Sequence, residues 1–167
     1  GAPHIRVYPD SFTNRILGFE WWPATMVDLS IDGVYYGSAL SDLWGSVRFD
    51  DMTELLTIGR EVVMTDGKSI RTHIITGMSF DLIDQLNDRV SGTASEPGYV
   101  KTCAWAPGYD IEWVDTTTDL LGNWTAQYTI DIVPSSDGCA RQFDSEGNQS
   151  VYYWILPNPR FTVNLNM

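Results

Sequence analysis

The sequence contains no long apolar run and very little lysine. None of its 167 residues belongs to an apolar stretch approaching the ~18–20 residues needed to cross a bilayer, which predicts no membrane insertion. Only Lys68 and Lys101 are lysines, so Ser, Thr, Asn and Asp must supply much of the polar surface, as in extracellular β proteins. The formal net charge of −12 would repel a phosphate backbone, which argues against nucleic acid as a partner.

Histidine, the commonest catalytic base, occurs only as His4 and His73. The sequence has no G-x-S-x-G motif that would hold a nucleophilic serine on a sharp turn. Two carboxylates such as Asp110 and Glu112 are what a glycosidase requires, but a chain with 22 acidic residues contains such pairs by accident. The sequence therefore predicts a protein that is not an enzyme.

Cysteine is also scarce, since only Cys103 and Cys139 are present. In an oxidising compartment, a disulfide between them would stabilise the fold by about 3–4 kcal/mol. The alternative is a pair of buried free thiols. The surrounding sequence has no zinc or redox cysteine pattern, so a disulfide without a metal cofactor is the prediction.

Helix signals are nearly absent, and the best candidate, residues 50–56, would form one or two turns. Elsewhere short β-rich runs are interrupted by Gly, Pro, Asn and Asp, which predicts an all-β fold of the sandwich type. Asp66-Gly67 between two such runs predicts a hairpin turn. The predicted strands are 5–8, 15–20, 26–31, 46–49, 61–65, 69–75, 79–83, 89–94, 99–105, 111–114, 123–130, 140–143, 151–156 and 160–165.

An internal repeat divides the chain. Segment 14–18 aligns with segment 88–92, so that Gly18 corresponds to Gly92. The same offset places Pro23 opposite Pro97, and at a slightly larger offset the strand that follows Gly45 matches the strand that follows Gly122. The repeat predicts two units, residues 1–77 and 78–157, followed by a connector, 158–167, that holds an orphan strand.

The second copy carries the motifs Val90–Ala94, Glu96–Gly98 and Leu121–Ala126. These resemble the V-x-G-x-A strand, P-G turn and G-N-W-x-x strand of bacterial immunoglobulin-like repeats in secreted and cell-surface proteins. The resemblance implies two tandem immunoglobulin-like β-sandwich units and an extracellular or cell-surface location. It implies no particular ligand.

One loop has oxygen-bearing side chains at alternate positions, Asp144, Glu146 and Asn148. Calcium binds several such oxygens, so a calcium site is one hypothesis for this loop. A solvated β-turn is the alternative and is favoured, because the segment is shorter than an EF-hand loop and lacks its final Glu. Asn148 also begins an N-x-S sequon in a polar loop, which makes it the candidate glycosylation site.

Tryptophan and tyrosine are abundant, with seven and eight residues. Core packing accounts for most of them. Trp22, Trp105 and Trp113 are the candidates for surface roles, since exposed rings stack on sugars or anchor subunit interfaces. A glycan is therefore one candidate partner.

The orphan strand has apolar residues on one face and no evident partner in its own unit. An unpaired β-edge is a template for another chain, so the strand could join subunits. The prediction is an extracellular structural subunit that assembles head to tail with itself, into a filament or surface layer. Alternatives are a two-repeat segment of an adhesin stalk and a carbohydrate-binding module. The proposed assembly residues are Arg160, Phe161, Thr162, Val163 and Leu165.

Overall fold

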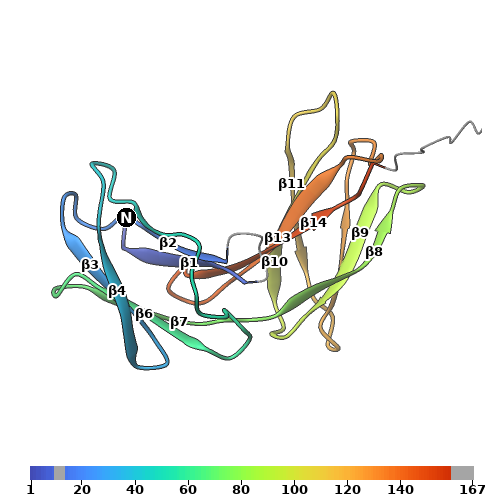
Figure 1. Ribbon diagram of the computed structural model, residues 1–167. Helices are drawn as coiled ribbons and strands as arrows, with labels where there is room; N and C mark the ends of the chain where they lie inside the picture. Colours follow the sequence, from blue (N-terminus) through green and yellow to red (C-terminus); the bar gives the residue numbers. More distant parts are fainter. Residues whose placement is uncertain (10–13, 159–167) are drawn as a thin grey trace, which may run out of the picture.

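The computed structural model describes residues 1–9 and 14–158, and these form an all-β protein (Figure 1). No helix occurs within these ranges, and so none that could span a membrane. The strands are β1 (His4–Tyr8), β2 (Arg15–Phe19), β3 (Met26–Ile31), β4 (Val34–Leu40), β5 (Val47–Phe49), β6 (Glu61–Thr65), β7 (Ile70–Ile74), β8 (Met78–Asp84), β9 (Arg89–Ala94), β10 (Tyr99–Trp105), β11 (Glu112–Thr117), β12 (Asn123–Gln127), β13 (Asp137–Phe143) and β14 (Gln149–Ile155).

The strands form three sheets whose order repeats along the chain. A four-stranded sheet has the order β4-β3-β6-β7, and the same order recurs seven strands later as β11-β10-β13-β14. Likewise β1-β2-β5 corresponds to β8-β9-β12. Gly18 on β2 and Gly92 on β9 therefore occupy corresponding strands. The chain crosses from one half to the other between Ile74 and Met78. The predicted domain boundaries themselves stay predictions.

The fold differs from two separate sandwiches in the way its sheets are joined. Strand β14 pairs in parallel with β1, which joins β11-β10-β13-β14 and β1-β2-β5 into a single seven-stranded sheet. Figure 1 shows the two halves of this shared sheet meeting at an angle where β14 lies beside β1. The halves are thus connected by backbone pairing as well as by the linker.

Each half encloses its own hydrophobic core between two sheets. In the first half, alternating side chains of β1, β2 and β5 pack against those of β3 and β6. In the second half, β9 and β12 pack against β10, β13 and β14. The alternation of apolar and polar residues thus predicts which face of each strand is buried. Large buried side chains include Ile5, Ile16, Trp21, Leu29 and Met64 in the first core, and Trp124, Tyr128, Ile132 and Trp154 in the second.

Two local predictions were wrong. Residues 50–56 form bends and loop without a helix. Strand β4 was not predicted, because Gly37 and Ser38 interrupt its β-rich run and its edge position leaves most of its side chains partly or fully exposed. The hairpin turn at Asp66-Gly67 is confirmed, since β6 and β7 pair antiparallel on either side of it.

Gly92 is required by close packing within the second half. A Cβ at this position would lie 1.8 Å from the Ser79 carbonyl oxygen and 2.7 Å from the Trp124 ring. We expect Gly92→Ala to lower the free energy of unfolding by about 1–3 kcal/mol, measured by urea denaturation. Gly37→Ala is the matched control, because an added Cβ there meets nothing within 4 Å. Equal midpoints for the two variants would contradict this explanation.

Candidate functional site

The first candidate site is the junction between the two halves. The parallel pair of β14 with β1 is short, with Arg6 opposite Gln149 and Val7 opposite Ser150. The loop before β14, residues 144–148, reaches β7 of the first half. Polar side chains at this junction are buried, so each requires a hydrogen-bond partner there.

Asn148 connects three segments at the junction. Its side chain is fully buried, at 0% exposure. Its Oδ1 accepts a hydrogen bond of 2.8 Å from the Ile5 N–H, and its Nδ2 donates to the Thr72 carbonyl at 3.1 Å and to Asp144 Oδ2 at 2.9 Å. One amide thus satisfies backbone groups on β1 and β7 from the loop before β14.

A second chain of hydrogen bonds crosses the same junction. His73 Nδ1 lies 2.9 Å from Asp144 Oδ2, and His73 Nε2 lies 2.9 Å from Ser150 Oγ. The Thr76 N–H donates to the same Oγ at 3.0 Å. Because a carboxylate only accepts, the neutral imidazole donates from Nδ1 and accepts the Ser150 hydroxyl at Nε2. Both ring nitrogens of His73 and the Ser150 hydroxyl then have partners.

Burial and hydrogen bonding decide the charge states of His73 and Asp144. Burial lowers the pKa of His73, against the opposing effect of the Asp144 hydrogen bond, so the imidazole is neutral at neutral pH. Burial acts to raise the pKa of Asp144, but hydrogen bonds from His73, Asn148 and the backbone outweigh it and lower that pKa overall. The junction therefore holds one negative carboxylate and no buried positive charge from His73.

The order Ser150–His73–Asp144 is that of a hydrolase triad. Ser150 is fully buried, however, and His73 is 2% exposed. A neighbouring hollow is lined by Asp144 and Thr76 together with Glu96, Pro97, Tyr99, Gln142 and Phe143, and neither Ser150 nor His73 borders it. A nucleophile must reach its substrate, so this geometry supports a structural role for the chain of hydrogen bonds. The absence of enzymatic activity stays a prediction.

The geometry of the loop before β14 does not favour two hypotheses, which stay predictions. Both carboxylate oxygens of Asp144 accept hydrogen bonds from the protein, and Glu146 forms an ion pair with Arg71 at 3.7 Å, so these residues and Asn148 do not surround a common cation. Among the described residues, no group of three His, Cys, Asp or Glu side chains is placed to hold a metal. A glycan on Asn148 does not fit either, because its Nδ2 is buried and donates two hydrogen bonds.

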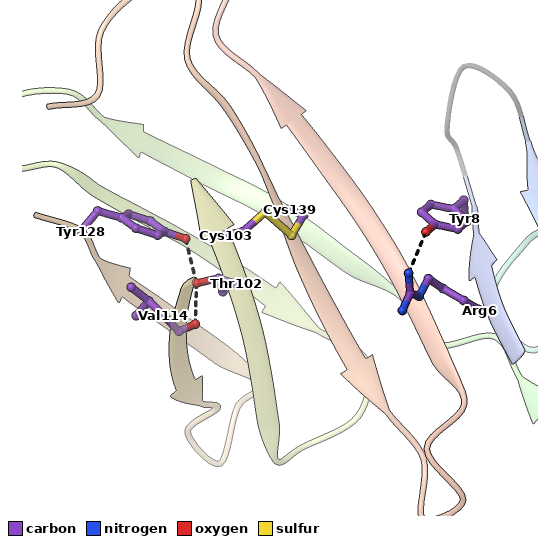
Figure 2. The surroundings of a disulfide bond; sticks show 7 residues. All are labelled: Arg6, Tyr8, Thr102, Cys103, Val114, Tyr128 and Cys139. Carbon is purple, nitrogen blue, oxygen red and sulfur yellow. Dashed lines mark hydrogen bonds between the residues drawn. A yellow bond between two sulfur atoms is a disulfide. The ribbon is translucent and has the colours of Figure 1, made fainter. Parts of the chain in front are cut away.

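The disulfide lies on the outer face of the shared sheet. Cys103 on β10 and Cys139 on β13 stand directly opposite one another and are bonded (Figure 2). On the other face of β10, Tyr128 donates to Thr102 Oγ1 at 2.7 Å, and Thr102 donates to the Val114 carbonyl at 2.8 Å. The bond thus joins neighbouring strands of one sheet, and no disulfide bridges the two sheets of this half in the described chain.

The three candidate tryptophans are separated by the fold. Trp105 and Trp113 lie on the outer face of the shared sheet, 39% and 43% exposed. Trp22 is 67% exposed and lies in the loop between β2 and β3, in the first half. Trp113 is positioned by two cations, with Lys101 Nζ 5.2 Å and the Arg141 guanidinium 4.8 Å from its ring centre. The predicted assembly strand, residues 160–165, lies outside the described residues.

Sequence reasoning missed the two largest features of the site. The junction residues His73 and Ser150 gave no signal, because their contact joins strands far apart in the sequence. The basic residues of the outer face were also missed. The alternation of Arg6 with buried Ile5 and Val7 on β1 was a signal that could have indicated an outward-facing arginine.

No family model matches the chain, and no curated protein matches it. Among solved structures, a tetra-tandem repeat in the extending region of a large adhesion protein aligns with 92% of this chain and 48% of its own, at 17% identity and a TM-score of 0.38. A structure of a 1.5-MDa bacterial ice-binding adhesin, concerned with retention at a host cell surface, aligns with 91% and 60%, at 15% identity and a TM-score of 0.33. Similarities of this size carry no argument about function.

Proposed function

We propose that this chain is a rigid spacer segment of a secreted or cell-surface protein, such as the stalk of an adhesin. In such a segment, sandwich units follow one another and hold a binding region away from the surface. The observation that carries the proposal is the buried polar junction between the halves, centred on Asn148. A junction with buried, directional hydrogen bonds fixes the angle between units, whereas a solvated linker leaves it free.

The linker between the halves is itself restrained. The Gly77 N–H donates to Ser95 Oγ and the Ser95 N–H donates to the Gly77 carbonyl, both at 2.8 Å. The Tyr152 hydroxyl donates to the Thr76 carbonyl at 2.7 Å. Thr76 and Gly77 are thus tied to the second half, while the backbone of Ile75 bonds Gly59 and Arg60 in the first half. A chain that served only as a flexible tether would not need these bonds.

The disulfide supports the extracellular part of the proposal. Disulfides persist in oxidising compartments and are rare in reducing ones. The Cys103–Cys139 bond and the scarcity of lysine are both in keeping with a secreted protein. Head-to-tail assembly through residues 160–165 is a separate proposal. Sedimentation distinguishes it, since a spacer segment remains a monomer while strand exchange gives species that grow with concentration.

A distance measurement between spin labels tests the rigid junction. Labels at Val34 and Leu86, which are 70% and 89% exposed, report on the two halves. We expect one narrow distance distribution at neutral pH. Labels at Leu86 and Leu120, both in the second half, provide the control width. A between-half distribution that is much broader than this control, or that has two peaks, would contradict the spacer proposal.

A further inference from the structure

Positive charge is concentrated on one face of an acidic protein. Of ten Lys and Arg residues in a chain of net charge −12, five lie on the outer face of the shared sheet. Strand pairing places Lys101 opposite Arg141, and it places Leu17 between Arg6 and Arg48. The fifth, Arg15, pairs with Tyr8. The face therefore has a local charge opposite to that of the whole chain.

Three of these arginines are not neutralised within the described chain. Arg6, Arg15 and Arg141 form no ion pair there, and the Nε of each is buried without a hydrogen-bond acceptor. By contrast, every described arginine outside this face has a carboxylate within 4.0 Å. Burial lowers the pKa of Arg141, and the positive charge of Arg6 lowers it further. Arg6 and Arg141 are thus close enough to repel each other, and an anion between them would relieve that repulsion.

Aromatic rings hold the guanidinium groups in place. The Arg6 guanidinium lies 4.5 Å from the Phe19 ring centre, that of Arg15 4.4 Å from Tyr8, and that of Arg141 4.8 Å from Trp113. Beneath them, Tyr8 and Leu17 pack with Val151 in a third apolar cluster. A stacked guanidinium keeps its planar edge in a fixed orientation, which favours two-point hydrogen bonding to a carboxylate or sulfate.

The same face offers exposed rings for a sugar. Trp105 and Trp113 are partly exposed, and Tyr153 on β14 is 49% exposed and stacks on Tyr8 with ring centres 5.9 Å apart. Aromatic faces stack on the C–H faces of sugar rings. Three carboxylates border this region: Asp50 forms an ion pair with Arg48 at 3.0 Å, Asp115 lies opposite Lys101, and Asp137 lies opposite Trp105. They confine an anionic group to the middle of the sheet, over β13, β14 and β1.

We propose that the outer face of the shared sheet binds an acidic polysaccharide. A carboxylate or sulfate of the polymer would lie between Arg6 and Arg141, and its sugar rings would lie against Trp113 and Tyr153. The net charge of −12 opposes every polyanion, so binding must depend on the local positive charge of this face and must weaken as salt rises. This inference does not depend on the spacer role, because the angle between the halves can be fixed whether or not the face binds a ligand.

Isothermal titration calorimetry of the full chain tests the proposal at low salt. The probes are polygalacturonate for carboxylate, dextran sulfate for sulfate, and dextran as a neutral polymer. We expect binding to polygalacturonate, to dextran sulfate or to both, weakening as salt rises, and no binding to dextran. The stronger of the two acidic polymers identifies the anionic group. Equal binding to dextran, no binding to either acidic polymer, or tighter binding to single-stranded DNA would overturn the proposal.

Matched variants locate the site. Arg141→Gln and Arg6→Gln should each weaken binding by about tenfold or more, as expected for loss of a charge-assisted contact of about 1.5–3 kcal/mol. Arg89→Gln is the control, since Arg89 lies on β9 of the opposite sheet and pairs with Asp84 at 3.2 Å. If Arg141→Gln fails to fold, Lys101→Gln tests the same position from the neighbouring strand. Equal weakening by Arg89→Gln, or no weakening by the outer-face variants, would overturn the proposal.

Discussion

Replacing Asn148 with alanine is expected to lower the free energy of unfolding by about 3 kcal/mol, because buried backbone groups on both sides of the junction lose their partner. The Ile5 N–H and the Thr72 carbonyl would remain buried beside a methyl group. Each unsatisfied group costs about 1–3 kcal/mol, and the loss of the contact with Asp144 adds to this. Urea denaturation monitored by tryptophan fluorescence measures the change.

The chain contains a closely matched control for Asn148. Asn123 ends a loop with the same hydrogen-bond pattern, in which Asp119 accepts from the backbone in the way that Asp144 does before Asn148. The Asn123 side chain is exposed, however, and within the described residues its amide donates hydrogen bonds only to Asp119. Asn123→Ala should therefore cost about 1 kcal/mol or less. Equal losses for the two variants would show that the junction contributes nothing beyond the loop itself.

Removing the disulfide is expected to lower the free energy of unfolding by about 3–4 kcal/mol, because the bond closes a long loop and restricts the unfolded chain. Cys103 and Cys139 are separated by 36 residues and lie on neighbouring strands of the second half. The Cys103→Ser, Cys139→Ser double variant should unfold at a lower guanidinium concentration than the oxidised protein.

A reducing agent provides the control for the disulfide prediction. It should lower the stability of the native protein toward that of the double variant and leave the double variant unchanged. If the double variant is as stable as the oxidised protein, the bond has no stabilising role in this fold. Two alkylatable thiols in the native protein would show that the bond does not form.

The local pattern of residues was sufficient to predict most strands. The bounds of β3, β6, β9 and β10 agree with the predicted ranges, because apolar side chains alternate with polar ones where one face of a strand is buried. Strand β4 was missed because it lies at the sheet edge, where side chains on both of its faces are partly or fully exposed and no alternation of apolar and polar residues marks a buried face. The all-β class follows from this pattern, while the immunoglobulin-like identity of the units stays a prediction.

The candidate sites were less accessible to sequence reasoning. Trp105 and Trp113 were identified by their abundance and spacing, and the structure places both on the outer face. The calcium and glycosylation hypotheses stay predictions that the geometry does not favour, because a run of polar residues does not reveal whether its side chains face solvent. The polar side chain of Asn148 does not face solvent. It is buried and forms hydrogen bonds with backbone groups.

By itself the sequence determined the all-β class, most of the strands and the repeat, because these depend on neighbouring residues along the chain. Only the tertiary structure decided that β14 would pair with β1 and make one sheet of two halves. That contact joins opposite ends of the described chain. Arg6 and Arg141 are likewise far apart in the sequence and close enough in the fold for their charges to interact. Pairing between distant strands depends on how whole sheets twist and meet, and no local pattern of residues records that geometry.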